Sequence, residues 1–423
     1  MKYWKHLNHA KRFIQLKTFC IAIILCMGLS PVVNAQETAP QFTLDELLKL
    51  AEQNSLQLKI ADLDKQIALA DYKESRSLTN PEIEYSQGKA TPMEEPGKLK
   101  IWDLGAKWSM PNPFHRYYLL KSLRADAAQA EIQSHVNKRN TLNELKTHFY
   151  KLQLLEKLKT FANERHNVLS ELVKIAETKA EIGETKKIDA MRASVELQKS
   201  STEIFKLEKA IAFEKSKIQE YVNFTIPESF EIRENFEFST LPAIETVIQK
   251  RVESAPIIQI EYSKVAGKTA SLKAARFSIL ESIELSGEKG KEIDGKIWKL
   301  GVGISFPLFN QNTFAIRKAK LEKEKAITEF NLANKQFKGE LQQILGEIRV
   351  LEKEISSFQN LLLEEGKESL EVSTRLYREG EIPLVVFLDA QTGFYEIQGR
   401  YYEAITEWNI QKSELEALIG GLK

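Results

Sequence analysis

Side chains that could carry catalytic or metal chemistry are few and widely spaced in this chain. Beyond residue 35 the histidines lie 20, 13 and 18 residues apart, at His115, His135, His148 and His166. None forms the i, i+4 pair, or stands beside the cysteine, that a transition-metal site needs. No Walker loop, Gly-x-Ser-x-Gly elbow or Ser/His/Asp set is present. The sequence therefore predicts no enzyme, no metal site and no cofactor.

Two other patterns could indicate a binding site. Gly301-Val-Gly303 is part of a nucleotide fingerprint, but it lies inside an alternating strand and no glycine-rich helix start follows it, which favours glycines that face a lumen. Runs of Glu and Lys, such as residues 321–325, are typical of solvated helix faces with i, i+4 pairing.

Residues 1–35 have the composition of a secretory signal peptide. They hold five basic residues, no acid, and an apolar run from Phe19 to Leu29. That run is shorter than the roughly 20 residues that span a bilayer, and small residues follow it, so we expect cleavage after Ala35. The remaining chain has a net charge of −4, which gives no support for nucleic-acid binding.

Both cysteines, Cys20 and Cys26, leave with this leader unless Cys26 is a lipidation site. The preceding Ile23-Ile-Leu25 lacks the small residues of a lipoprotein signal. A secreted chain without cysteine suits an oxidising compartment but forms no disulfide.

The rest of the chain reads as two similar halves, residues 36–230 and 231–423. Trp102 recurs as Trp298 after 196 residues, and Gly183 recurs as Gly380 after 197 residues. Repeats of one structural unit bury their apolar surfaces against each other, so the two halves are expected to share one architecture.

Alternation with a period of two predicts two strands in each half. One face of each strand is apolar and carries Trp, while the other is polar. Strands of about ten residues with this pattern are typical of an outer-membrane β-barrel, whose apolar face meets lipid and whose polar face meets a wet lumen. The strands are expected at about 81–89, 98–110, 277–287 and 297–306, with a polar turn at 288–295. The residues expected to face lipid are Trp102, Leu104, Trp108, Trp298, Leu300, Val302, Ile304 and Phe306.

Very long helices follow each pair of strands. Apolar residues such as Leu142, Leu145, Phe149 and Leu152 step by three and four, the spacing of a coiled-coil seam. Each long helix would be about 100 Å long, and two shorter helices laid end to end nearly match it. The long helices are expected at 113–179 and 311–378, the return helices at 184–222 and 384–420, and the shorter helices at 56–78 and 256–276. Short helices are also expected to begin at Phe42–Glu46, capped by Thr43 or Asp45, and at Leu241–Glu245.

Four strands cannot enclose a lumen, since about eight are needed just to surround packed side chains. The chain must therefore pool its strands with further copies. The expected fold is mainly α with a small membrane β-barrel: a duplicated long-helix α-barrel plus four strands per protomer, closed as a trimeric barrel of twelve strands.

With these features the chain resembles the TolC-like outer membrane efflux protein family over residues 42–420. The resemblance rests on the repeat, the hairpin in each half, the Ser305–Asn310 segment and the glycine-centred helix tips. It implies a homotrimeric channel in outer-membrane lipid, with a large periplasmic extension. It also implies a periplasmic adaptor (membrane fusion protein) and an inner-membrane pump, expected to be of the RND type. The tip residues implied to contact the adaptor are Gly183, Glu184, Gly380 and Glu381.

The resemblance also implies a gate. In some family members two acids one turn apart on the second-half return helix narrow the periplasmic entrance. The second of those positions matches Asp389 and the first matches Val386, while Asp189 takes the equivalent of the first position in the other half. Asp389 and Asp189 are therefore candidate gate residues, and the alternative is that they are solvated helix-tip acids.

The function expected from this resemblance is a passive conduit that exports small solutes, metal ions or drugs, from the periplasm or cytoplasm. The compact length resembles the heavy-metal (CzcC-like) or drug-efflux branches. Two alternatives remain open, the outer-membrane component of type I protein secretion and a soluble periplasmic coiled-coil scaffold.

Overall fold

The computed structural model describes residues 39–91, 97–183, 186–233, 236, 238–240, 255–280, 282–304 and 311–420. The expected signal peptide, the helix start at Leu241–Glu245, the tip residue Glu184, the strand residue Phe306 and the Ser305–Asn310 segment lie outside these residues.

The chain divides into two compact units. The first comprises Met1–Gln41 and Ser229–Glu231, and in its described part Glu231 N donates to Pro40 O over 3.0 Å. That bond belongs to the pairing of two short strands, β1 (Gln41–Phe42) and β4 (Glu231–Ile232). The second unit, Phe42–Glu228 with Ile232–Lys423, contains the long helices and the larger sheet, and so draws on both expected halves.

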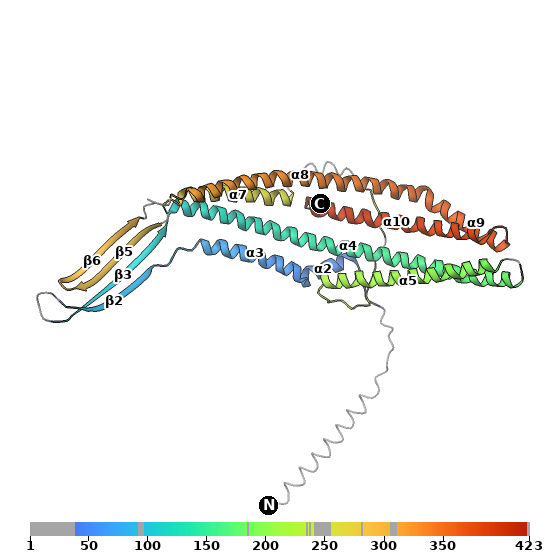
Figure 1. The fold of residues 1–423 in the computed structure, drawn as a ribbon, viewed down its shortest axis with the longest axis horizontal. Coiled ribbons are helices and arrows are strands. Elements are labelled where there is room, and N and C mark those ends of the chain that lie inside the picture. The colour runs from blue at the N-terminus through green and yellow to red at the C-terminus, as the bar shows by residue number, and fades with distance from the viewer. Residues whose placement is uncertain are drawn as a thin grey trace, which may run out of the picture. The chain divides into compact units, whose positions relative to one another are not determined.

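The larger sheet has four antiparallel strands in the order β2-β3-β5-β6. Each half supplies one hairpin, and β3 pairs with β5 to join them, as Figure 1 shows. β2 and β6 are therefore the edges of the sheet. The strands are β2 (Glu82–Ala90), β3 (Leu99–Pro111), β5 (Ser282–Glu292) and β6 (Gly295–Ile304).

The prediction of a strand at 277–287 with a turn at 288–295 is wrong. Phe277 ends a helix, and its ring stacks on Phe114 at 5.5 Å and on Tyr118 at 5.6 Å. The strand begins at Ser282 and runs to Glu292, which pairs with Gly295 across a tight turn. Lysines and glycines continue the alternation where hydrophobicity stops, so a hydrophobic criterion ended the strand too early.

The first half contributes four helices. α2 (Leu44–Asn54) starts with a capping box, in which Thr43 Oγ1 accepts from Glu46 N and Glu46 Oε2 accepts from Thr43 N. This reciprocal pairing satisfies two free donors of the first turn, and it resolves the expected cap in favour of Thr43. The other helices are α3 (Leu56–Ser75), α4 (Pro113–Glu181) and α5 (Lys187–Tyr221).

In the second half the expected long helix is interrupted. A five-residue π-helical turn, η1 (Phe358–Leu362), separates α8 (Thr313–Ser357) from α9 (Leu363–Glu379). Such a turn inserts one extra residue into the helix, so the residues after it present a shifted face. Gln359 within η1 donates to the Tyr401 hydroxyl over 3.0 Å. The flanking helices are α7 (Pro256–Phe277) and α10 (Leu384–Ile419).

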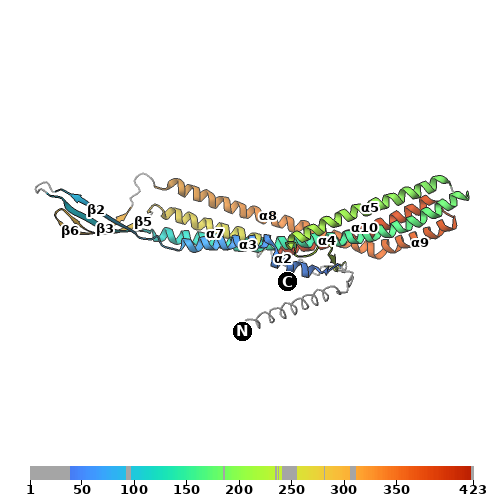
Figure 2. The ribbon, with the colours of Figure 1, turned by 90° about the horizontal axis from the view of Figure 1, so that it is seen from below.

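α4 is the central packing element. It contacts α3 and α5 from its own half and α7 and α10 from the other, while α8 contacts α7 and α10 (Figure 2). The core between α7, α8 and α10 includes Trp408, Phe337 and Ile355, all almost fully buried. Among the described residues no helix combines the length and apolarity that crossing a membrane requires.

Asn112 fastens the sheet to the helices. Its side chain, 5% exposed, accepts from Phe114 N at 2.9 Å and so caps α4. The same amide donates to the carbonyls of Phe277 at 3.0 Å and Leu280 at 2.9 Å. One buried side chain thus joins the start of α4 to the segment between α7 and β5.

We predict that Asn112→Leu destabilises the protein by about 1–3 kcal/mol, because it removes a helix cap and leaves the carbonyls of Phe277 and Leu280 without their side-chain donor. The change is measured as a shift in the chemical denaturation midpoint. Gln133→Ala is the matched control, since it removes an exposed hydrogen bond to Asn137 on the same helix. Equal shifts in the two variants would contradict the anchoring role of Asn112.

Candidate functional site

The four-stranded sheet has two chemically distinct faces. Directly opposite residues in an antiparallel pair project from the same face, so the register assigns each side chain to one of them. Trp108, Leu285 and Val302 form one row across β3, β5 and β6, and Met110, Ile283 and Ile304 form the next. We call this side the apolar face and the other the polar face.

The apolar face is uncovered in this chain. Trp298 is 74% exposed, Leu300 80% and Val302 70%. Trp102, Leu104 and Ile304 are also exposed, so six of the residues expected to face lipid project freely from the apolar face. Trp108 is half-buried because its indole nitrogen donates to Thr79 O over 2.9 Å, next to the helical part of the chain.

The polar face carries charges that pair across strands. Lys107 Nζ lies 3.0 Å from Glu284 Oε1, and Lys299 Nζ lies 3.6 Å from Glu292 Oε1. Ser86 donates to Asp103 on the neighbouring strand. The larger sheet therefore has one charged face and one exposed apolar face, as the alternation predicted.

The helix tips form the second candidate region, at the opposite ends of α4 and α9 from the sheet (Figure 1). Gly183 and Gly380 both have positive φ angles, of 80° and 81°, which disfavour any residue with a Cβ. After α9, Glu381 N donates to Leu376 O over 2.9 Å, the bond of a Schellman helix end. The two expected tips are therefore glycine-dependent reversals.

A small core holds the two tips together. It joins buried residues of α4, α5, α9 and α10, among them Leu172, Ala193, Tyr377 and Phe387. Lys179, near the end of α4, donates to the carbonyls of Tyr377 and Arg378 at the end of α9, at 3.5 and 3.4 Å. A cation at a helix C-terminus is electrostatically favourable, so this contact ties one tip to the other.

The two candidate gate acids lie on different helices of this region. Asp389 is exposed on α10, on the same side as Val386, because the helix buries Leu384 and Phe387 instead. Asp189 is half-exposed in the first turn of α5. Burial, and then the nearby Asp189 carboxylate, raise the pKa of the Tyr377 hydroxyl, which places Asp189 beside the tip core.

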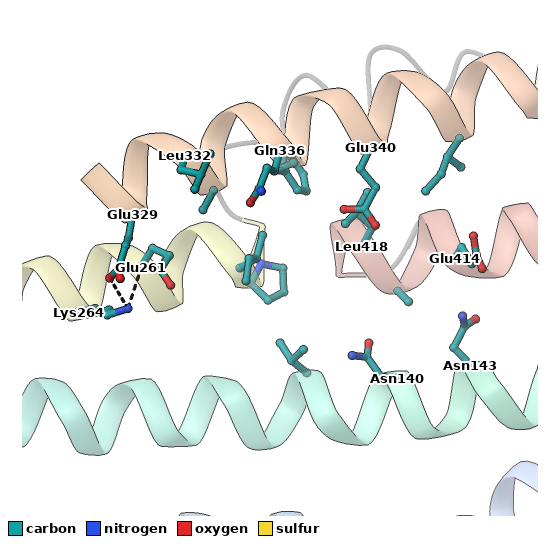
Figure 3. A pocket seen from close by; sticks show the side chains of 17 residues that line it. Asn140, Asn143, Glu261, Lys264, Glu329, Leu332, Gln336, Glu340, Glu414 and Leu418 are labelled. Atoms are coloured by element: carbon teal, nitrogen blue, oxygen red, sulfur yellow. Dashed lines mark ion pairs between the residues drawn. The ribbon is translucent and has the colours of Figure 1, made fainter. Parts of the chain in front are cut away.

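A groove of about 710 Å³ lies between α4, α7, α8 and α10 (Figure 3). Lys264 occupies one end, with its Nζ 2.6 Å from Glu329 Oε2 and 3.7 Å from Glu261 Oε2. Glu340 and Glu414 face the other end. Sequence reasoning missed this groove because its lining comes from four separate helices and leaves no local pattern.

Carboxylates crowd one another beside this groove. Burial raises the pKa of the Glu414 carboxyl, and the carboxylates of Glu407, Glu347 and Glu340 raise it further. Among the described residues, no group of three or more His, Cys, Asp or Glu could hold a metal ion. Because burial and neighbouring carboxylates raise the pKa of Glu414, ionisation of this acid lowers the stability of the folded protein.

Two of the helical histidines take part in packing contacts between α4 and α5. His148 Nδ1 lies 2.6 Å from Glu214 Oε2, and His166 Nδ1 lies 2.9 Å from Ser200 Oγ. The structure therefore gives both side chains a role in joining these helices.

Comparison with solved structures identifies the fold. The chain is similar to CusC, whose structures concern transmembrane channel formation, with a TM-score of 0.78, 16% identity and coverage of 93% of this chain and 95% of CusC. It is similar to the outer membrane protein VceC of Vibrio cholerae, with a TM-score of 0.77, 15% identity and coverage of 90% and 97%. It is also similar to the MtrE outer membrane channel of Neisseria gonorrhoeae, with a TM-score of 0.76, 16% identity and coverage of 89% of each chain.

Scans against protein-family models and against curated proteins found no match. At the identities of the solved structures the likeness is one of fold. The chain therefore has the fold of outer-membrane channels, as the resemblance to TolC-like proteins predicted, and the mainly α class with a small set of strands is confirmed.

We predict that Glu414→Gln raises stability at neutral pH. The folded-state pKa of this acid is raised, so the folded protein binds its proton more tightly than the unfolded chain does, and ionisation above the unfolded pKa costs stability. The gain should disappear as the pH is lowered below the unfolded pKa of about 4.3. It is measured from denaturation midpoints across that range.

Glu416→Gln is the control on the same helix. Glu416 pairs with Lys146 at 3.3 Å, so its neutralisation should leave stability unchanged or lower it slightly at neutral pH. A stability gain of the same size in both variants would mean that the net charge of the protein, rather than repulsion between the carboxylates around Glu414, determines the gain.

Proposed function

We propose that this chain is the outer-membrane channel component of a tripartite efflux system. It acts as a passive trimeric conduit for small solutes, metal ions or drugs. The observation that carries the proposal is the sheet, whose apolar face is exposed while its polar face is charged and paired. That arrangement suits a barrel wall with lipid outside and water inside.

The unpaired sheet edges support assembly from several copies. β2 and β6 each have one strand neighbour within the larger sheet, and four strands are too few to close a barrel around a lumen. In a ring, β6 of one copy would meet β2 of the next in antiparallel orientation. Three copies would place twelve strands in one closed barrel, which removes every edge.

The helices also carry apolar seams whose side chains are exposed in the described part of the chain. On α3, Leu56, Ile60, Leu63 and Ile67 are exposed at spacings of four, three and four, as in a coiled-coil seam. On α8, exposed apolar residues include Phe314, Leu321, Leu332 and Val350. Packing of one copy's α3 side against the next copy's α8 side would bury both seams and close the trimer.

The helices would then extend into the periplasm. The tips at Gly183, Glu184, Gly380 and Glu381 would meet a periplasmic adaptor, and an inner-membrane pump of the RND type would supply the energy. The duplicated halves 36–230 and 231–423 would each contribute one hairpin and one tip. The contact between Lys179 and the end of α9 supports this reading, because it couples the two tips of one chain.

Cell fractionation and site-directed labelling test the proposal. The protein should leave the outer membrane as a trimer only on addition of detergent, and should conduct ions in planar bilayers. A Leu300→Cys variant should react with a lipid-soluble maleimide. Lys299→Cys, the next residue on the opposite face, should react with a water-soluble one.

Both native cysteines lie within the first 35 residues, so cleavage of the expected signal peptide would leave the introduced cysteine as the target of this labelling. A monomer that stays in the buffer-soluble fraction and does not conduct would favour the soluble scaffold instead. Equal labelling of both positions by the water-soluble reagent would show that residue 300 does not face lipid.

Asp389 is proposed to narrow the periplasmic entrance as a ring of three carboxylates. Rings of acidic side chains favour cations, so Asp389→Asn should lower the cation-to-anion permeability ratio severalfold in single-channel recordings. Glu379→Gln, a neutralised exposed acid at the end of α9, is the charge-matched control. Identical selectivity in Asp389→Asn and the wild type would exclude Asp389 from the gate.

A further inference from the structure

The two faces of the larger sheet differ in the sign of their unpaired charge. Alternation places five lysines on the apolar face, toward the hairpin turns. Along the described parts of the four strands, that face carries no carboxylate. We call these residues the lysine band: Lys89, Lys100, Lys289, Lys291 and Lys296.

The polar face shows the opposite arrangement. Its six carboxylates outnumber its two lysines, and both lysines, Lys107 and Lys299, lie within 4.0 Å of a carboxylate. The lysine band has no ion pair with any described residue and is exposed throughout. The charges of the lysine band therefore have no protein counter-ion on the sheet.

The register makes this arrangement unfavourable without an anion. Lys89 lies directly opposite Lys100, and Lys291 lies directly opposite Lys296. Like charges facing each other across antiparallel strands destabilise a sheet. Two such pairs in one four-stranded sheet, with no carboxylate on the same face of its described strands, favour a negative group bound at this face.

The neighbouring residues indicate where that group lies. Lys291 is directly opposite Trp102, and Lys289 is directly opposite Trp298. Trp side chains at the ends of membrane strands sit at the level of the lipid headgroups. From Trp102 to Trp108, near the helices, β3 advances by about 20 Å, so an apolar stretch separates the lysine band from the helical end.

We propose that the lysine band binds the phosphate groups of lipids in the leaflet at the turn end of the barrel. This inference rests on the proposed function, because it requires the apolar face to meet lipid. Each lysine would lay its methylene stem along the apolar face and direct its ammonium group to a lipid phosphate. The bound phosphates would separate the facing lysine pairs and so favour the sheet register seen here.

The test compares two charge-matched double variants of the full-length, detergent-extracted protein. Lys291→Gln/Lys296→Gln removes two charges from the lysine band, and Lys107→Gln/Lys299→Gln removes two from the polar face. Binding of diphosphoryl lipid A is measured by native mass spectrometry. Two lost lysine–lipid contacts should weaken it roughly thirtyfold in the first variant, while the second variant binds as the wild type does.

A stability measurement keeps the test decisive if binding is hard to quantify. In neutral detergent, Lys296→Gln removes the repulsion from Lys291, so its melting temperature should rise above that of the wild type. In phosphatidylcholine vesicles containing diphosphoryl lipid A, the order should reverse, because the wild type gains more from the lipid. The same order in both conditions would overturn the proposal.

Other outcomes also decide the question. Equal loss of lipid A binding in both double variants would overturn the lysine band as a phosphate site. Competition by inorganic phosphate at the same concentration as the lipid would show a free-anion site and overturn the lipid assignment. Absence of the protein from the outer-membrane fraction would contradict the proposed function. Fractionation shows this before any lipid-binding measurement is made.

Discussion

Unpaired backbone groups along β2 and β6 are the constraint on which the rest of this structure depends. In the larger sheet β2 and β6 each pair with one described strand, so the outer backbone groups of both strands face away from the sheet, and lipid offers such groups no hydrogen-bond partner. Closure through further copies satisfies these groups at once. The proposed trimer and its lumen follow from that requirement. Neighbouring copies in such a trimer would also cover the exposed apolar seams on α3 and α8.

The sheet takes its position from a few contacts with the helices. Asn112 caps α4 and holds the carbonyls of Phe277 and Leu280, while the ring of Phe277 stacks on Phe114. At the other end, Lys179 joins the tips of α4 and α9. Because α4 packs against helices of both halves, it links the region proposed to meet lipid to the region proposed to meet the adaptor.

Sequence patterns predicted the regular elements well and the transitions poorly. The start of α4 was predicted at the correct residue, since Pro113 after Asn112 is a strong start signal, and six exposed residues of the apolar face follow from alternation alone. The start of β5 was misplaced because Phe277 belongs to a helix that packs through aromatic stacking. The π-turn at Phe358–Leu362 and the groove beside Glu414 depend on packing between distant helices, which no local window contains.

The order of charges and apolar residues along each strand by itself determined that the sheet would have two faces, because successive strand residues project to opposite sides. The starts of α2 and α4 and the glycine-centred reversals were also determined locally, by capping and backbone sterics. Only the tertiary structure decided that the lysines of β2 and β3, and those of β5 and β6, stand opposite one another. Register is a relation between strands, set by the turns and by packing against the helices, and a single strand does not encode it.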